Sequence, residues 1–337
     1  MHKKITVKDV ALAAGVSRTA VSLVLNDKEC NISENTKKRI KETAKKLDYV
    51  PNHIARSLAT NKTKTIGVII PNISNSFFAE IVRHIQIELN KSGYDIFLCD
   101  SDEQTKNDIK YIKLLSSRNV DGLILTMSAE SLSEGNINNV KSVLEKTGVP
   151  FVLLDRYFVG NVPKVLVDNV GGGYNVCKYL IDNGHKDIGV ITGPLSLNSS
   201  SDRLEGVIKA LNENNLTLKK ENIYSGNYDI ETGRLGGEAL LGKVKTIFAF
   251  NDMQAFGVIE AAKEKGLKIP NDFSLVGFDD TFYSQILETQ LTTVRQPIKE
   301  LAMEVCDLIL KCIENPEYRK EIRLATDLIV RDSVKKL

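Results

Sequence analysis

From residue 65 onward, short apolar runs alternate with stretches of helical length, and this alternation limits the fold more than any other feature of the chain. Continuous apolar runs are typical of parallel strands that are buried on both faces. The candidate strands are residues 66–70, 95–99, 122–126, 150–154, 188–192, 246–250 and 274–278. Candidate helices between them include residues 77–91, 173–183, 201–212 and 252–265. The pattern predicts a doubly wound α/β body with parallel sheets.

The first 62 residues differ from this body in charge. They hold 13 Lys and Arg against 6 Asp and Glu, a balance of +7, which leaves −5 for the rest of a chain whose net charge is +2. A small basic segment on a mildly acidic body indicates a polyanionic partner for that segment. A solvated basic face without a partner explains the charge equally well.

Capping signals divide the basic segment into three helices. Thr6 and Asp9 form a capping box, and apolar residues then recur at helical spacing as far as Gly15, where the first helix is expected to end. Ser17 and Ser33 are the expected caps of the second and third helices. Two helices joined by a short glycine turn, followed by a supporting helix, are typical of a helix-turn-helix domain. A three-helix bundle with another role is the alternative.

The second helix of such a domain enters the major groove of DNA, where its early outward residues reach base edges. Here those residues are Arg18, Thr19, Ser22 and Leu23. Arg18 can donate two hydrogen bonds to guanine, and Thr19 can hydrogen-bond to a base or offer its methyl group to thymine. The sequence therefore predicts double-stranded DNA as a partner.

Two N-terminal motifs resemble the LacI/GalR family of lactose-repressor-like transcription regulators. One is Val-Lys-Asp-Val-Ala at residues 7–11 with Ala-Gly-Val-Ser at 14–17, and the other is Leu-Asp-Tyr-Val-Pro-Asn-His-Ile-Ala-Arg-Ser-Leu at 47–58. The resemblance extends over nearly the whole chain. It implies a repressor that binds a pseudo-palindromic operator as a dimer and responds to a small-molecule effector. The DNA-binding residues that it implies are Thr6, Ser17, Arg18, Thr19, Ser22, Leu23, Asn26, Asn52, Ala55, Arg56 and Leu58.

Leu23 departs from the family pattern, which often has a basic or polar residue at this position. A leucine cannot donate a hydrogen bond and touches at most a thymine methyl group. The operator of a relative therefore does not transfer to this chain.

The resemblance also implies a domain organisation. Residues 1–50 are the DNA-binding domain, 51–63 the hinge helix and linker, and 64–337 the effector-binding and dimerisation domain. In the family, the hinge helices of two subunits pair in the minor groove and a leucine wedges into the central base step. Leu58 matches that leucine. A plain linker, with Leu58 folded onto the body, is the alternative.

The expected body is similar to a type I periplasmic sugar-binding protein, with two α/β subdomains that are joined by three crossovers around a ligand cleft. Residues 64–160 and 294–325 would form the subdomain near the DNA, and residues 162–292 would form the distal subdomain. Ligands of open α/β sheets bind beyond the carboxyl ends of the strands. Asp155, Asn251 and Asp279 each follow a candidate strand directly.

Eight residues match effector-cleft positions of the family: Phe77, Phe78, Asp155, Arg203, Tyr228, Asn251, Asp279 and Gln296. Planar polar groups can hydrogen-bond in pairs to hydroxyl groups, and aromatic faces cover the apolar side of a sugar ring. A sugar or a related metabolite is the expected effector. The alternatives are a core position for each aromatic residue, a helix N-cap for Asp279, and a surface ion pair for Arg203.

No catalytic chemistry is indicated. A Gly-x-x-x-x-Gly-Lys match at residues 237–243 lacks the Ser or Thr that should follow, and the glycines at 171–173 lack dinucleotide-binding spacing. Catalytic and metal-ligand motifs are missing from the sequence, so we expect no enzyme activity, no cofactor and no metal. A solute-binding protein of a transporter is the main alternative to a regulator, and a sugar- or nucleotide-acting α/β enzyme is the third.

The expected location is the cytoplasm, and the expected assembly is a dimer without membrane contact. Five scattered cysteines without a Cys-x-x-Cys motif favour reduced thiols. The N-terminus has no apolar signal core, and no run is long enough to span a membrane. Only four residues follow residues 330–333, so a leucine heptad that could tether dimers into a tetramer is not expected.

Overall fold

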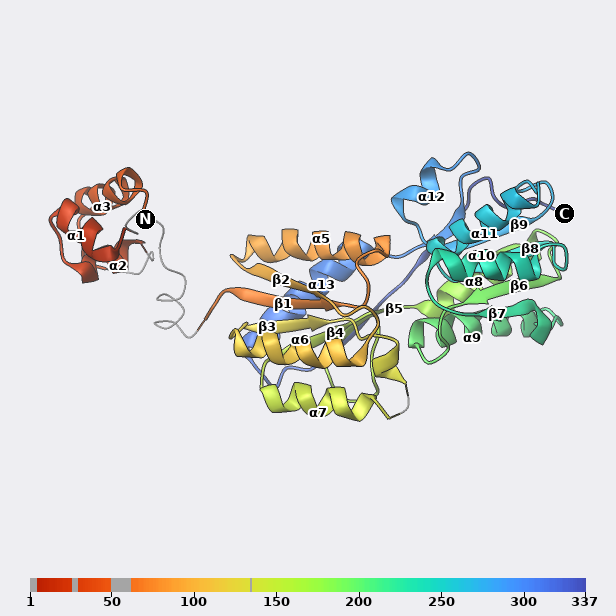
Figure 1. Cartoon of the computed structure of the whole chain (residues 1–337), viewed down its shortest axis with the longest axis horizontal. Helices are drawn as coiled ribbons and strands as arrows, with labels where there is room; N and C mark the ends of the chain where they lie inside the picture. The colour runs from red at the N-terminus through yellow and green to blue at the C-terminus, as the bar shows by residue number, and fades with distance from the viewer. Residues whose placement is uncertain (1–4, 26–29, 50–61, 134) are drawn as a thin grey trace. The chain divides into compact units, whose positions relative to one another are not determined.

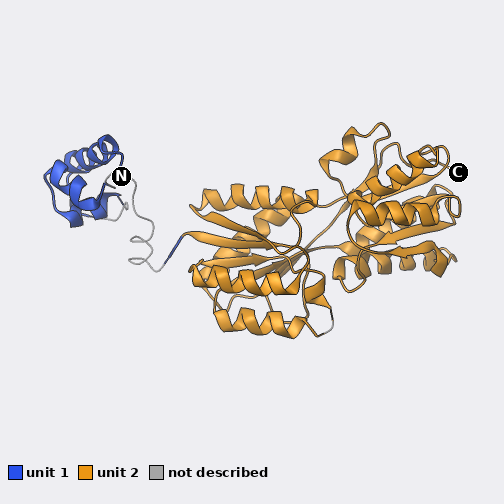
Figure 2. Cartoon of the chain, in the orientation of Figure 1, with its two compact units in different colours: residues 1–63 blue, residues 64–337 orange. Residues whose placement is uncertain are grey.

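The computed structural model describes residues 5–25, 30–49, 62–133 and 135–337. The chain divides into two compact units, residues 1–63 and 64–337 (Figure 2). The first unit holds the helices α1 (Val7–Ala14), α2 (Arg18–Leu25) and α3 (Glu34–Lys46). Helix α2 follows α1 after a short turn, as in a helix-turn-helix.

The predicted caps set the ends of these helices. Asp9 Oδ2 accepts a hydrogen bond from Thr6 N at 2.9 Å, and Thr6 Oγ1 accepts from Asp9 N at 3.4 Å. Gly15 ends α1 with φ 63°, a left-handed conformation that glycine adopts without strain. Ser17 Oγ accepts from Ala20 N at 3.1 Å at the start of α2. The small core of the unit consists of Val10, Ala11, Ala14, Val21, Val24, Ile40 and Ala44.

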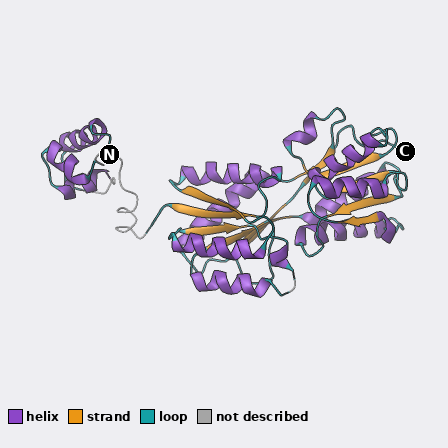
Figure 3. Ribbon diagram, in the orientation of Figure 1, coloured by secondary structure: helices purple, strands orange, loops and turns teal. Residues whose placement is uncertain are grey.

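The second unit contains two six-stranded sheets (Figures 1 and 3). The first sheet has the order β11 (Glu321–Leu324), β5 (Lys164–Val167), β4 (Phe151–Leu154), β3 (Gly122–Leu125), β1 (Thr65–Ile70), β2 (Asp95–Asp100). The second has the order β12 (Asp327–Ile329), β10 (Thr292–Arg295), β9 (Ser274–Asp279), β8 (Thr246–Ala249), β6 (Ile188–Thr192), β7 (Ile223–Ser225). All neighbouring strands are parallel except β10 and β12.

Helices cover both faces of each sheet, which confirms the doubly wound fold. The first sheet lies between the layers α5 (Ser76–Lys91) with α13 (Ile298–Glu314) and α6 (Thr105–Ser117) with α7 (Ile137–Thr147). The second lies between α8 (Asn169–Asp182) with α9 (Asn198–Glu213) and α10 (Ile230–Leu240) with α11 (Asp252–Glu264). The short helices are α12 (Phe282–Ile286), Glu130–Leu132 and Lys220–Asn222.

The crossings between the two sheets differ from the predicted boundaries. β5 pairs with β4 and β11 in the first sheet, so the first crossing comes after Val167 and not near residue 161. β10 pairs with β9 in the second sheet, so the next crossing follows Arg295. The chain crosses again between β11 and β12. The predicted boundaries were misplaced because β5 and β10 are only four residues long and each lies at the edge of its predicted segment.

Strand β2 also differs from the expected pattern of burial on both faces. It is the edge strand of the first sheet, and Phe97 and Leu98 are exposed on it. None of the helices in the described part of the chain combines the length and the apolar character needed to cross a lipid bilayer.

Candidate effector cleft and DNA-reading helix

The eight predicted cleft residues all line one cavity between the two subdomains of the second unit. Phe77, Phe78 and Asp155 come from the first subdomain, and Arg203, Tyr228, Asn251 and Asp279 come from the second, with Gln296 at a crossing. The cavity has a volume of about 20 Å³, which is room for about one water molecule. The two walls are therefore nearly closed on each other.

Arg203 lies inside α9, not in a loop that precedes the helix, and its side chain is buried with 3% exposure. Its Nε donates to Asn169 Oδ1 at 2.9 Å, and its Nη1 donates to the carbonyl oxygen of Phe250. The guanidinium carbon lies 3.5 Å from the centre of the Phe278 ring. The alternative of a surface ion pair is therefore wrong, because the side chain is held by an amide, a carbonyl and an aromatic face.

Asp279 is the last residue of β9 and turns its carboxylate into the cavity. Oδ1 accepts a hydrogen bond from Gln296 Nε2 at 2.6 Å. Helix α12 begins after Thr281, and Asp279 does not cap it, so the helix-cap alternative is wrong. Burial raises the pKa of Asp279 well above its usual value, while the positive charge of Arg203 opposes this shift.

Asp155 and Arg156 follow β4 and face the cavity from the first subdomain. Burial raises the pKa of the Asp155 carboxyl group, which the charge of Arg156 opposes. Arg156 Nη1 donates to both carboxylate oxygens of Glu103, at 3.0 and 2.8 Å, and to the carbonyl oxygen of Met127. The sequence reasoning did not identify Arg156; its position next to Asp155, directly after a strand, was the available signal.

The aromatic residues have both of the roles that the sequence left open. Phe77 and Phe78 pack edge to face, with ring centres 5.1 Å apart, within the core of the first subdomain, and they also line the cavity. Tyr228 lies on the opposite wall, where its hydroxyl accepts a hydrogen bond from Ser200 Oγ at 2.8 Å. Two polar residues that were not predicted, Asn75 and Ser199, also line the cavity.

Asn251 is the N-cap of α11 as well as a lining residue. Its Oδ1 accepts from Gln254 N at 2.9 Å, and its Nδ2 donates to the carbonyl oxygen of Tyr228 at 3.3 Å. The cap fixes the orientation of the amide, so this residue connects the start of a helix to the wall that carries Tyr228.

In the part of the chain that the structure describes, three buried polar atoms of the cavity have no hydrogen-bond partner: Asp155 Oδ1, Gln296 Oε1 and Arg156 Nε. Two of them are acceptors and one is a donor. A buried polar atom without a partner is costly, about 1–3 kcal/mol for each atom. The cleft therefore presents unused hydrogen-bonding capacity to a molecule that can both donate and accept.

In the first unit, the predicted base-reading residues lie on the outer side of α2. Arg18, Thr19 and Ser22 are exposed and Leu23 is half-buried, whereas Val21 and Val24 face the core. Thr6 and Ser17, the other implied DNA contacts here, are exposed at the starts of α1 and α2. The remaining implied contacts lie outside the described residues; they are Asn26, Asn52, Ala55, Arg56 and Leu58.

Comparison with known families assigns both parts of the chain. Residues 6–52 match the bacterial regulatory proteins of the lacI family, and residues 63–331 match the periplasmic binding proteins and sugar binding domain of the LacI family. The chain belongs to the LacI family. The LacI-family resemblance that the N-terminal motifs carry is therefore confirmed.

LacI-family relatives match over nearly the full length. The transcriptional repressor PurR of Actinobacillus pleuropneumoniae serotype 3 (strain JL03) is 36% identical, over 98% of this chain and 99% of the relative. PurR of Vibrio vulnificus (strain CMCP6) is 32% identical over the same shares. The lac repressor dimer bound to operator and the anti-inducer ONPF matches with a TM-score of 0.87 and 25% identity, over 99% of this chain and 100% of the other.

Another solved structure, the complex of the regulator CelR with cellobiose, has a TM-score of 0.73 and 27% identity, over 98% of this chain and 99% of the other. With its helix-turn-helix domain and effector domain, the present protein is a LacI-family, DNA-binding, ligand-responsive transcriptional regulator. Its relatives are transcriptional repressors. In the described ranges, no group of three or more His, Cys, Asp or Glu side chains is placed to hold a metal ion.

Proposed function

We propose that this regulator is a repressor whose effector is a neutral, hydroxyl-rich molecule such as a sugar, bound by the eight predicted residues of the cleft. The observation that carries the proposal is the set of unpartnered buried atoms, namely Asp155 Oδ1, Gln296 Oε1 and Arg156 Nε. A hydroxyl group donates one hydrogen bond and accepts others, so adjacent hydroxyl groups can satisfy acceptors and donors on both walls.

The balance of charge favours a neutral effector over a phosphorylated one. Arg203 and Arg156 bring two positive charges, and Asp155, Asp279 and the Glu103 partner of Arg156 bring carboxyl groups. Arg156 is already paired with Glu103, and the Arg203 guanidinium is held by Asn169, the Phe250 carbonyl and the Phe278 ring, whereas a dianionic phosphate favours several free Arg or Lys groups. The aromatic side chains supply the apolar surface that a sugar ring needs on one side.

The small cavity supports a mechanism in which the effector changes the separation of the subdomains. A volume of about 20 Å³ cannot hold a sugar ring, so the walls must part for the ring to enter and then close on it. We propose that this movement alters DNA affinity through residues 51–63, the hinge, and that residues 1–50 read the operator. On this proposal Leu58 is the minor-groove wedge, and Thr6, Ser17, Arg18, Thr19, Ser22, Leu23, Asn26, Asn52, Ala55 and Arg56 are the other DNA contacts.

The proposed working form is a cytoplasmic homodimer that carries out no catalysis. The described part of the chain has an exposed apolar face on α12, where Phe282, Tyr283 and Ile286 are 65%, 54% and 61% exposed. Clustered exposed apolar side chains mark interaction surfaces. The similar lac repressor structure is a dimer bound to operator, which supports the same assembly here.

The test is a ligand screen by thermal shift and calorimetry on the full-length protein. The panel contains neutral hexoses, pentoses and disaccharides, their phosphate esters, and planar heterocyclic bases. The proposal expects a neutral sugar to bind wild-type protein and to lose at least tenfold in affinity with Gln296→Leu, which keeps the shape and removes both the free Oε1 acceptor and the Nε2 donor to Asp279. Preferential binding of a phosphate ester or a heterocyclic base would overturn the proposed effector class.

A further inference from the structure

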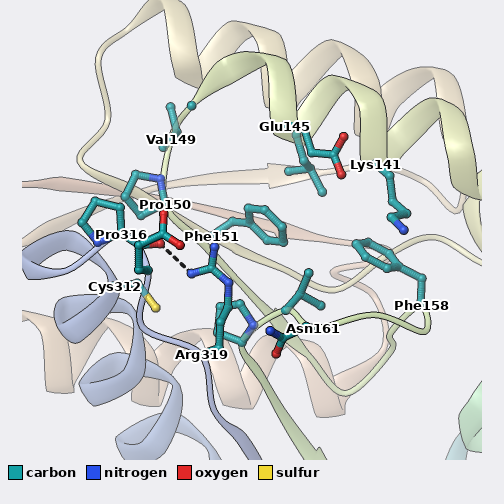
Figure 4. A pocket seen from close by; sticks show the side chains of 15 residues that line it. Lys141, Glu145, Val149, Pro150, Phe151, Phe158, Asn161, Cys312, Pro316 and Arg319 are labelled. Carbon is teal, nitrogen blue, oxygen red and sulfur yellow. Dashed lines mark hydrogen bonds between the residues drawn. The ribbon is translucent and has the colours of Figure 1, made fainter.

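A second cavity, larger than the effector cleft, lies in the first subdomain (Figure 4). Its volume is about 440 Å³, which is within the usual size of small-molecule sites, about 300–1,000 Å³. It is formed where β4, β5 and β11 begin, between the turn after α7, the β4–β5 loop and the loop after α13. Its walls therefore come from the end of the sheet opposite to the effector cleft.

The floor of this cavity consists of apolar side chains that pack against the core of the first subdomain. Phe158, Leu144 and Cys312 are buried there, and Phe151 and Val149 are partly exposed to the hollow. Leu144 and Phe158 belong to the core under α7, whereas Cys312 belongs to the core under α13. The cavity thus lies where the helical layers of α7 and α13 meet. Its apolar floor can contact an apolar ring of a ligand.

The positively charged side chain of Arg319 lies above this apolar floor. Figure 4 shows the guanidinium group of Arg319 reaching toward Phe151, with a hydrogen bond to Pro316. Its Nη1 donates to the carbonyl oxygens of Pro316 and Tyr318, at 2.5 and 2.9 Å. Arg319 is an exposed residue, and among the described residues its Nε and Nη2 have no protein acceptor, so both donors face the open side of the hollow. Those two donors form a planar pair that matches a carboxylate.

The other charged groups at the rim limit the charge of a ligand. Lys141 holds its Nζ 5.2 Å from the centre of the Phe158 ring, while Glu145 and Glu317 bring two negative charges to the rim. The charges of Lys141, Arg319, Glu145 and Glu317 sum to zero. The rim therefore has no net positive charge that could attract a ligand with several negative charges. A single carboxylate beside Arg319 is the charge that this arrangement accommodates.

We infer that this cavity is a second ligand site, separate from the effector cleft, for a ring-bearing monocarboxylate. The ring lies on the partly exposed Phe151 and Val149, above the buried Phe158, and the carboxylate accepts from Nε and Nη2 of Arg319. The β4–β5 loop joins the two sites, because Asp155 and Arg156 line the cleft and Phe158, a few residues later, lines this cavity. A ligand here restrains a loop that also forms a wall of the effector cleft.

The test compares 2-naphthoate with its neutral analogue 2-naphthamide by calorimetry on the full-length protein at neutral pH. We expect naphthoate to bind once per chain and about 10- to 100-fold more tightly than naphthamide, as expected for a charge-assisted pair of hydrogen bonds. Arg319→Gln should abolish this difference, and Val149→Trp, which fills the hollow, should abolish binding of both molecules.

Two controls separate this site from others. Arg118→Gln removes an arginine that directly follows α6 and does not line the cavity, and Asn251→Ala changes the effector cleft; both should keep the preference for naphthoate. Equal binding of the two probes to wild-type protein, or an unchanged preference in Arg319→Gln, overturns the inference. If Val149→Trp fails to fold by circular dichroism, the Arg319→Gln comparison alone decides.

Discussion

Asp279 is the residue of the effector cleft whose substitution should most directly affect effector binding. It is buried, it is hydrogen-bonded to Gln296, and it lies near the charge of Arg203. We expect Asp279→Ala to abolish the response to effector and to leave operator affinity unchanged, because the change is confined to the second unit. Fluorescence anisotropy on operator DNA, with and without effector, measures both quantities. Asp182→Ala, an exposed carboxylate on α8, is the control, and an unchanged effector response in Asp279→Ala would remove this residue from the site.

Arg18 carries the most specific DNA prediction, because it is exposed at the start of α2 and can pair with guanine. Arg18→Ala should lose about 1–3 kcal/mol of discrimination at one base pair in each half-site. Competition binding with operators that are substituted at single positions measures the loss. Lys178→Ala, in the second unit, should leave the preference unchanged. Uniform weakening across all sequences would show that Arg18 contacts phosphate and not a base.

The buried carboxyl group of Asp252 should make the free energy of unfolding depend on pH. Burial raises its pKa to about 7, although Thr281 and Thr293 donate hydrogen bonds to it. Between the ordinary pKa of Asp, about 4, and this raised value, the native state binds a proton that the unfolded state has lost. The group therefore stabilises the fold most below pH 4, and the contribution is lost as pH rises toward 7.

Thermal unfolding between pH 4.5 and 7.5 tests this sign. The wild-type midpoint should contain a component that falls as pH rises, and Asp252→Asn, which cannot ionise, should flatten it. Asp307→Asn, an exposed carboxylate on α13, is the matched control and should leave the slope unchanged. A slope in Asp252→Asn equal to that of wild type contradicts the prediction.

At the scale of elements, the sequence predicted most strands that have strong apolar runs and missed the short ones. Strands such as β6 and β9 are fully buried, so their apolar runs were easy to read. The missed strands are β5, β7, β10, β11 and β12, which have three or four residues each, and β11 carries charged residues at its exposed positions. The equally short β3, β4 and β8 were predicted because longer apolar runs surround them in the sequence. Such strands are determined by their pairing with neighbours, which a local pattern does not reveal.

The same limit applies to the candidate site. All eight predicted residues line the cavity, because the carboxyl ends of parallel strands and the family resemblance indicated the same positions. Arg156 was missed because its role depends on Glu103, which precedes it by 53 positions in the chain. The environment of Arg203 was also missed, since its partner Asn169 lies on another helix.

Gly173 shows how helix packing supports the cleft. It lies within α8, and a Cβ atom at this position would be 2.2 Å from the carbonyl oxygen of Arg203 on α9. Alanine would otherwise favour a helix by about 0.5–1 kcal/mol. Gly173→Ala should therefore lower the unfolding midpoint and weaken effector binding, because α9 must move and carries Arg203 with it. Thermal scans and calorimetry measure both effects. Lys178→Ala on the exposed side of α8 is the control, and a stabilised Gly173→Ala variant would contradict the packing account.

At the scale of the whole molecule, the proposed dimer depends on the exposed apolar face of α12. Ile286→Asp should convert a dimer into a monomer, because it places a charge on a surface that is exposed in the single chain and that the proposed dimer buries. Sedimentation at micromolar concentration measures the change. Val159→Asp, at an apolar residue that is 88% exposed elsewhere, should remain a dimer. A stable tetramer of the wild type, or a dimeric Ile286→Asp variant, would contradict this assembly.

The measurement that tests the central claim most directly is selection of the full-length protein on randomised duplex DNA, followed by sequencing, with and without the effector found in the screen. The account predicts enrichment of a pseudo-palindrome with two half-sites, and a change in that enrichment when effector is present. The absence of any enriched sequence, both without ligand and with every ligand of the panel, would contradict the assignment of this chain as a ligand-responsive DNA-binding regulator.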